Sequence, residues 1–154
     1  MEIIWQIQTN DPDMTEAQGV RLANMMLEDP ELPHFVALEG DLGVGKTVFV
    51  RGFVSVLVPG SAVRSPTFAL VNEYKKRDTR LPVYHFDVYR INDEDDLYST
   101  GFYDYLEENA VCLVEWSENI RYAFPDEYLT VRIEKNDIAH PESRMITVML
   151  EGRK

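Results

Sequence analysis

The stretch that decides the fold runs from residue 35 to residue 47 and reads Phe-Val-Ala-Leu-Glu-Gly-Asp-Leu-Gly-Val-Gly-Lys-Thr. Its first part, residues 35–39, is a short apolar run that leads into glycine, which is typical of a buried strand. Three glycines lie within residues 40–45. Residues 46–57 then carry apolar side chains at helical spacing, until Pro59-Gly60 ends the pattern. A strand, a glycine-rich loop and a helix in this order predict an α/β domain.

The loop and the residues that open the helix carry the first chemical signal. Residues 40–47 match the pattern G-x-x-x-x-G-K-[ST] at every position. Its glycines let the backbone turn N–H groups inward around an anion, and the helix adds the positive end of its dipole. Lys46 can reach the β- and γ-phosphates of a nucleotide, and the Thr47 hydroxyl can ligate Mg²⁺. We therefore expect a site for nucleotide phosphates rather than a simple glycine turn that opens a helix.

The rest of the chain adds strands and helices around this unit. Alternating apolar and polar residues predict a final antiparallel strand pair over 128–135 and 145–151, joined by an exposed loop that contains Pro141. Thr15 and Gln18 form a capping-box pattern, which predicts a helix over about residues 15–28. The remaining expected elements are strands at 2–8, 68–75, 82–90 and 110–114, and one or two short helices within 92–108. Together they predict a three-layer sandwich of the P-loop NTPase type with a mostly parallel central sheet, in a single domain over residues 1–154.

Composition and charge exclude several classes of protein. The chain has 154 residues, 45% of them hydrophobic, and a net charge of −12. It is not expected to bind nucleic acid over a broad surface, nor anionic lipid, because both need clustered Lys and Arg. No apolar run approaches the ~20 residues of a membrane span, and the first residues do not resemble a signal peptide, so we expect a cytoplasmic protein. The single cysteine, Cys112, lies in an apolar run and is expected in the core.

A phosphate-binding loop holds nucleotide, but hydrolysis also needs an acidic group for the metal and a group that positions water. The apolar run 111–114 ends in Glu115, at the kind of strand end where P-loop proteins place their second acid, although Asp is more usual there. We interpret Glu115 as that acid; the alternative is a surface carboxylate. Trp116 follows it and either closes over the nucleotide or packs as an ordinary core aromatic.

A second carboxylate, Asp87, lies in the segment His-Phe-Asp-Val-Tyr-Arg. On a strand over residues 82–90, His85, Asp87 and Tyr89 share one face. This polar row either directs Asp87 toward Mg²⁺ or water, or it is a solvated edge. Thr67 lies in Ser-Pro-Thr-Phe after the helix, where a threonine of P-loop proteins can sense the γ-phosphate; taken alone, that segment is only a turn signal.

Five segments follow one another along the chain. They are Gly-Asp-Leu-Gly-Val-Gly-Lys-Thr, Ser-Pro-Thr-Phe, Val-Asn-Glu-Tyr, His-Phe-Asp-Val-Tyr-Arg and Leu-Val-Glu-Trp-Ser-Glu. In this order they resemble the bacterial TsaE (YjeE) family, and the resemblance covers residues 10–135. The first segment is shared with many families, whereas the last two are much more specific. The resemblance implies a small P-loop ATPase needed for the threonylcarbamoyladenosine modification of tRNA.

The resemblance also implies roles for single residues. Lys46 would bind the phosphates of ATP, Thr47 and Glu115 would hold Mg²⁺, and Asp87 would be needed for hydrolysis. Lys46, Asp87 and Glu115 are thus the expected catalytic residues. Thr15 would lie near the adenine, and Val48 departs from the second Thr that the family commonly has there. The expected nucleotide-binding residues are Thr15, Gly40, Asp41, Leu42, Gly43, Val44, Gly45, Lys46, Thr47, Thr67 and Trp116.

The reaction of the family supplies the expected function. In that family TsaD and TsaB transfer the threonylcarbamoyl group to adenosine 37 of tRNAs that read ANN codons, and the TsaE-like protein binds that pair and resets it by hydrolysing ATP. The acidic charge fits a protein that docks on partners and leaves tRNA to them. Weak activity without partners is expected, because no dedicated motif supplies an arginine finger; Arg64 and Arg90 are candidates. Two alternatives stay open, a small-molecule P-loop kinase and a nucleotide-gated binding module, and residues 136–154 receive no function.

Overall fold

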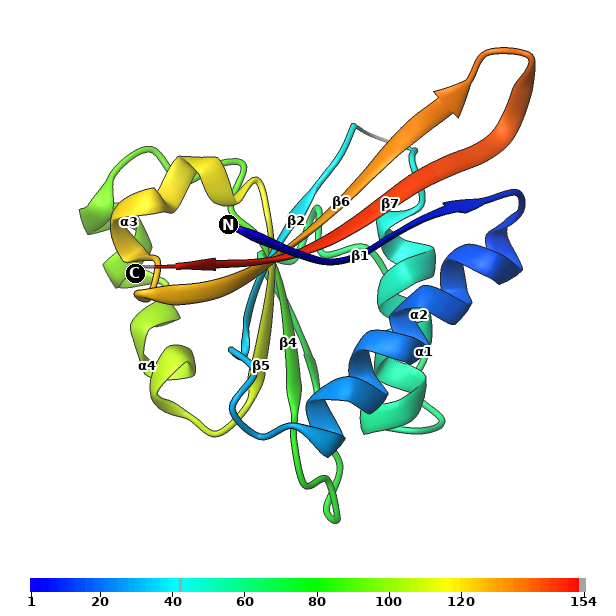
Figure 1. Cartoon of the computed structure of the whole chain (residues 1–154). Helices are drawn as coiled ribbons and strands as arrows, with labels where there is room; N and C mark the ends of the chain where they lie inside the picture. The colour runs from blue at the N-terminus through cyan, green and yellow to red at the C-terminus, as the bar shows by residue number, and fades with distance from the viewer. Residues whose placement is uncertain (42, 153–154) are drawn as a thin grey trace.

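The computed structural model describes residues 1–41 and 43–152. The described residues form one sheet of seven strands: β1 (Glu2–Thr9), β2 (Phe35–Glu39), β3 (Val71–Tyr74), β4 (Val83–Asp87), β5 (Val111–Glu115), β6 (Glu127–Asp137) and β7 (His140–Gly152). They lie in the order β1-β7-β6-β2-β5-β4-β3 (Figure 1). The central pairings β6–β2, β2–β5 and β5–β4 are parallel, and the pairings toward both edges are antiparallel. The predicted parallel centre and antiparallel C-terminal pair are confirmed.

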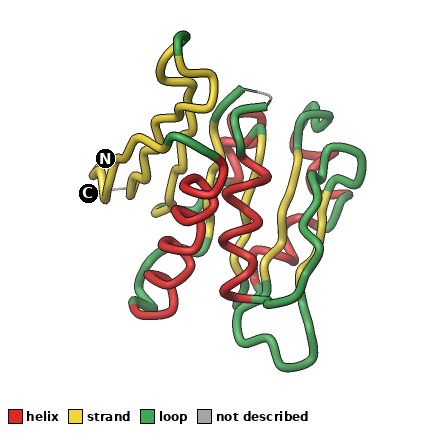
Figure 2. Tube along the Cα trace, turned by 90° about the vertical axis from the view of Figure 1, so that its right-hand side faces the viewer, coloured by secondary structure: helices red, strands yellow, loops and turns green. Residues whose placement is uncertain are grey.

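Helices cover both faces of this sheet. α1 (Pro12–Glu28) and α2 (Lys46–Leu57) lie side by side on one face (Figure 2). α3 (Glu94–Ser99), α4 (Phe102–Glu107) and the 3-10 helix η1 (Ser117–Ala123) lie on the other (Figure 1). None of the helices formed by the described residues has the length and apolarity needed to cross a bilayer. The three layers predicted from the sequence are therefore present.

Each face of the central strands has its own apolar core. In β2, Val36 and Leu38 pack in the core under α1 and α2, whereas Phe35 belongs to the core under α3, α4 and η1. In β5, Leu113 and Cys112 divide between the two cores in the same way. Because successive side chains of a strand point to opposite faces, a strand covered on both sides must be apolar throughout. This explains the two short runs of apolar residues without alternation.

The first helix begins earlier than the sequence predicts. Its N-cap is Asp11, whose side chain accepts a hydrogen bond of 2.8 Å from the Met14 N–H, and Pro12 occupies the first helical position. Aspartate at the cap followed by proline is a strong start signal, since proline has no N–H to leave unpaired there. The predicted start at Thr15 is wrong. Thr15 is instead a buried residue within the helix.

Strands β3 and β4 are shorter than predicted. β4 ends at Asp87, whose side chain accepts a hydrogen bond of 2.9 Å from the Tyr89 N–H. Such a local bond draws the backbone out of the sheet, so the prediction that Tyr89 shares a strand face with His85 and Asp87 is wrong. β3 begins only at Val71, because the amides of the two residues before it both donate to the Pro66 carbonyl and close a turn.

The C-terminal strands are longer than predicted. β7 begins at His140 and includes Pro141, so the exposed loop expected around this proline is wrong. A tight turn joins Asp137 to His140, and a bulge interrupts the pairing just before it. Proline is tolerated at such a position, near the start of a strand and beside a bulge. The result is a long β6–β7 hairpin that projects from the body of the molecule (Figure 1).

Burial makes Cys112 unreactive. Its side chain is 2% exposed, and burial raises the pKa of the thiol to about 12. Because the thiolate is the reactive form, we expect native protein to react with a disulfide reagent at pH 8 only as fast as it unfolds. The rate of thiolate release with and without denaturant tests this. Rapid reaction of the folded chain would contradict the burial of Cys112.

Candidate functional site

The glycine loop joins the end of β2 to the start of α2. Gly40, Gly43 and Gly45 have φ angles of +146°, +77° and +110°. Residues with a Cβ rarely adopt such backbone conformations. α2 begins at Lys46 with Gly45 as its N-cap, and no side chain caps it. The first amide groups of α2 are thus left for another acceptor, as in helix N-termini that bind phosphate. Leu42, one of the expected nucleotide-binding residues, lies outside the described residues.

Lys46 and Glu115 meet beside this loop. The Lys46 Nζ donates a hydrogen bond of 2.7 Å to the Gly40 carbonyl and lies 3.5 Å from Oε1 of Glu115. Both side chains are 8% exposed. Glu115 reaches this point because β5 lies next to β2 in the sheet, with Leu38 opposite Glu115 in the register. The loop lysine and the acid at the end of β5 therefore lie side by side in the fold.

His85 completes the environment of Glu115. It is fully buried in β4, and its Nε2 lies 2.6 Å from Oε2 of Glu115. This contact is an ion-pair distance without the alignment of a hydrogen bond, and neither ring nitrogen has a hydrogen-bond partner among the described residues. Asp87 lies two residues further along β4 and stands opposite Glu115 in the register. Side chains at positions i and i+2 of a strand share a face, so His85 and Asp87 lie on the same face of the sheet as Glu115.

The two carboxyl groups differ in how readily they lose a proton. Burial acts to raise the pKa of Glu115, but His85 and Lys46 outweigh it and hold the pKa below its usual value. Burial raises the pKa of Asp87, and the Glu115 carboxylate adds to this, whereas the hydrogen bond from the Tyr89 N–H opposes it. At neutral pH Glu115 is therefore an anion suited to a cation. Two neighbouring carboxyl groups with opposite shifts can divide acid–base roles between them.

These residues open into a cavity of about 830 Å³. This volume lies in the range of small-molecule sites. Its outer wall is aromatic: the rings of Trp116 and Tyr89 lie 4.7 Å apart at an interplanar angle of 54°. Asn119 donates hydrogen bonds to the carbonyls of Val88 and Tyr89, which ties the wall to η1. The lining residues are Gly43, Gly45, Lys46, Thr47, Val48, Ser65, Thr67, Phe68, Ala69, Leu70, Asp87, Tyr89, Arg90, Glu115 and Trp116.

The structure brings most of the predicted site residues to this cavity. The predicted residues that line it are Gly43, Gly45, Lys46, Thr47, Thr67, Asp87, Glu115 and Trp116. Gly40 and Asp41 line a neighbouring hollow, and the side chain of Val44 is buried in the core under α1 and α2. Thr15 is not among the lining residues but lies close to the loop, because a Cβ added to Gly45 would be 3.6 Å from its Cγ2.

Sequence reasoning gave little weight to His85 and none to Arg144. The spacing of two residues placed His85 on one strand face with Asp87, but its contact with Glu115 depends on the neighbouring strand and has no local signal. Arg144 carries no local signal. It lies in β7, and its Nε donates a hydrogen bond of 2.8 Å to the carbonyl of Val44, a residue 100 positions earlier in the chain.

A glycine loop between a central parallel strand and a helix, in a three-layer sandwich, defines a P-loop NTPase-like α/β protein. The family model of the threonylcarbamoyl adenosine biosynthesis protein TsaE matches residues 9–146, and the chain belongs to this family.

Individual relatives agree with the family model. The TsaE protein of Bacillus subtilis is 37% identical over 147 residues, which cover 96% of this chain and 86% of the relative. The TsaE protein of Haemophilus influenzae is 37% identical over 122 residues, covering 79% of this chain and 76% of the relative. The crystal structure of Bacillus subtilis YdiB superposes with a TM-score of 0.75 at 31% identity, covering 99% and 89% of the two chains. The predicted family and fold class are confirmed.

Proposed function

We propose that this member of the TsaE family is a Mg²⁺-dependent ATPase that supports the threonylcarbamoyladenosine modification of tRNA. It would be weak alone and stimulated by a TsaB–TsaD pair, and it would act in the cytoplasm. The observation that carries the proposal is the meeting of Lys46, Glu115 and Asp87 beside a glycine loop in one cavity. The family supports the pathway, and the site supports the nucleotide chemistry.

The loop and Lys46 fit the phosphates of a nucleotide. The uncapped amides at the start of α2 supply N–H donors, and Gly43 and Gly45 leave the loop wall without side chains. Lys46 Nζ now donates to the Gly40 carbonyl, and we expect it to exchange this neutral acceptor for phosphate oxygens. Phosphate oxygens are negatively charged, so they attract the Lys46 ammonium more strongly than the neutral carbonyl does, which favours the exchange.

Thr47 and Glu115 fit a magnesium ion that also binds the phosphates. Mg²⁺ is usually held by one or two protein oxygens together with water and phosphate oxygens, so a hydroxyl and a carboxylate suffice. The low pKa of Glu115 keeps its carboxylate charged for this purpose. When bound, the ion would neutralise charge on the phosphate oxygens.

Asp87 fits the remaining role, which is to orient the attacking water. It lines the cavity next to Glu115, and the rise in its pKa makes it a better proton acceptor than an ordinary aspartate. Trp116 and Tyr89 would shield this part of the cavity from bulk solvent. Arg90 also lines the cavity and could contact developing charge on the phosphate.

The decisive experiment is ATP hydrolysis in Mg²⁺, measured for the chain alone and with a TsaB–TsaD pair. We expect strong stimulation by the pair, and Lys46→Ala is expected to weaken ATP affinity by about 10- to 100-fold because it removes a charged donor. Lys75→Ala is the matched control, since Lys75 is exposed and follows β3. No turnover with the pair, or full turnover by Lys46→Ala, would contradict the proposal. ATP-dependent phosphorylation of a small molecule would favour the kinase alternative instead.

A further inference from the structure

The β6–β7 hairpin supports the glycine loop from behind. A Cβ added to Gly40 would lie 2.5 Å from the Ile133 carbonyl oxygen, so the start of the loop packs directly on the β6 backbone. Near the other end of the loop, Arg144 of β7 donates from Nε to the Val44 carbonyl at 2.8 Å. The glycine loop therefore contacts both strands of the β6–β7 hairpin. The sequence of this hairpin contains no motif that indicates a function.

Arg144 is itself held in place by its own strand. Its Nη1 donates hydrogen bonds of 2.6 Å to the Pro141 carbonyl and 2.9 Å to the Ser143 carbonyl. The guanidinium group is planar and rigid, so two bonds on one nitrogen also fix the direction of the Nε–H. The bond to Val44 is thus made by a preorganised donor rather than by a flexible surface side chain.

This bond determines which way the Val44–Gly45 peptide faces. The carbonyl and the N–H of a trans peptide point in opposite directions, and the described residues contain no cis peptide. Because Arg144 holds the Val44 carbonyl toward β7, the Gly45 N–H points away from β7, and Gly45 itself lines the cavity. In the opposite orientation the carbonyl dipole would face the phosphates and repel them.

The orientation of the Val44–Gly45 peptide has to be fixed by a residue outside the loop. Gly45 has a φ of +110°, and Gly43, two residues earlier, has a φ of +77°. Glycine enters many backbone conformations at low cost, so the glycines themselves do not determine the orientation of the peptide between Val44 and Gly45. Val44 is buried, and Arg144 is the side chain that bonds its carbonyl among the described residues.

We propose that Arg144 is a positioning residue for the phosphate site. It fixes the Val44–Gly45 peptide so that the Gly45 N–H is available to a nucleotide phosphate, and it acts only through that peptide. The inference rests on the proposed function, because it requires that the glycine loop binds nucleotide phosphates.

The test is ADP binding by Arg144→Gln, measured by titration calorimetry on the full chain. Loss of one well-placed donor to a charged phosphate is expected to weaken ADP binding about tenfold. Lys135→Gln is the matched control, because Lys135 stands opposite Arg144 in β6 and carries the same charge. Among the described residues Lys135 has no hydrogen bond or ion pair with the loop, so its variant should bind ADP like the unmodified chain. Thermal unfolding of both variants separates a loss of fold from a loss of positioning.

A second measurement uses the unmodified chain and does not depend on the folding of a variant. Amide hydrogen exchange by NMR should slow at least about tenfold at Gly45 when ADP binds, because the phosphate would cover that N–H. Unchanged exchange at Gly45 while other loop amides become protected would overturn the inference, as would a folded Arg144→Gln chain with normal ADP affinity. An unmodified chain that binds no ADP would overturn the proposed function as well, and the calorimetry of that chain alone distinguishes the two failures.

Discussion

Glu115→Gln is expected to lower TsaB–TsaD-stimulated ATP hydrolysis by about 10²- to 10³-fold, a loss comparable to that of a group that stabilises transition-state charge. Glutamine keeps the size of the side chain and an oxygen acceptor for Lys46. The substitution removes the negative charge that His85 and Lys46 stabilise in the buried site. We therefore expect the cavity to persist and the affinity for Mg²⁺ to fall.

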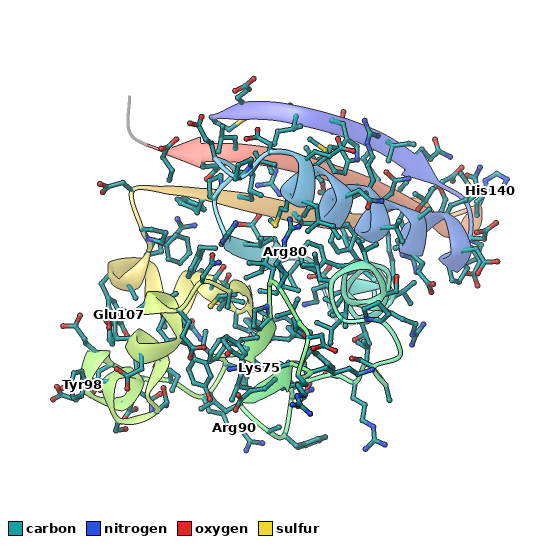
Figure 3. All side chains as sticks on the ribbon, turned by 90° about the horizontal axis from the view of Figure 1, so that it is seen from below. Lys75, Arg80, Arg90, Tyr98, Glu107 and His140 are labelled. Carbon is teal, nitrogen blue, oxygen red and sulfur yellow. The ribbon has the colours of Figure 1, made fainter. Side chains whose placement is uncertain are left out.

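The measurement is the hydrolysis rate over a series of Mg²⁺ concentrations, together with ADP affinity in the absence of Mg²⁺. ADP affinity without the metal should remain close to that of the unmodified chain, which shows that the loop is still folded. Glu107→Gln is the control, because Glu107 is an exposed residue of α4. Figure 3 shows Glu107 and Tyr98 in the α3–α4 layer and His140 at the opposite end of the molecule. Full stimulated activity of Glu115→Gln would remove Glu115 from the proposed site.

Gly19→Ala is expected to destabilise the fold by about 3 kcal/mol, at the upper end of overpacking effects. A Cβ at Gly19 would overlap the Phe49 carbonyl oxygen and lie 2.8 Å from the Phe53 nitrogen. Both contacts are with the backbone of α2, which cannot move aside as a side chain can. Gly52 of α2 approaches the Glu16 carbonyl in the same close manner, so the two helices pack backbone to backbone through a glycine from each.

The sign of the change in the free energy of unfolding shows whether close helix packing or helix propensity dominates at Gly19. In an exposed helix interior, glycine to alanine stabilises by about 1 kcal/mol, because alanine is the better helix former. Asn24→Ala, on the exposed side of α1, is the control and should change the free energy of unfolding by no more than about 0.5 kcal/mol. Urea denaturation of the two variants provides the measurement. A Gly19→Ala chain at least as stable as the unmodified chain would show that α1 and α2 do not approach as closely as the structure has them.

The parts of the fold that could be predicted are those with a strong local pattern. The apolar runs at 35–38 and 111–114 predict strands covered on both faces, because a strand with one wet face alternates. The start of α1 was missed for a local reason too, since Asp11 followed by Pro12 is a stronger start signal than a capping box at Thr15. The inclusion of Pro141 in β7 was missed because a bulge, invisible in the sequence, accommodates it.

The candidate site divides in the same way. The phosphate chemistry of Lys46 and Thr47 follows from their spacing to the glycines, since the loop and the helix are contiguous in the chain. Glu115 was placed at a strand end by its apolar run, but its contact with His85 depends on β4 being the neighbour of β5. Tyr89 lies outside β4 because its N–H donates to the Asp87 side chain instead of to a neighbouring strand. The spacing of apolar residues does not show which of these two hydrogen bonds forms.

The sequence by itself determined the glycine loop, the residues that carry its chemistry and the family to which the chain belongs. These features are local, because each rests on residues a few positions apart whose spacing limits what the backbone can do. Only the tertiary structure decided that His85 contacts Glu115 and that Arg144 bonds Val44. Such contacts depend on strand order and register, which are set by the packing of the whole sheet against its helices and not by any short segment.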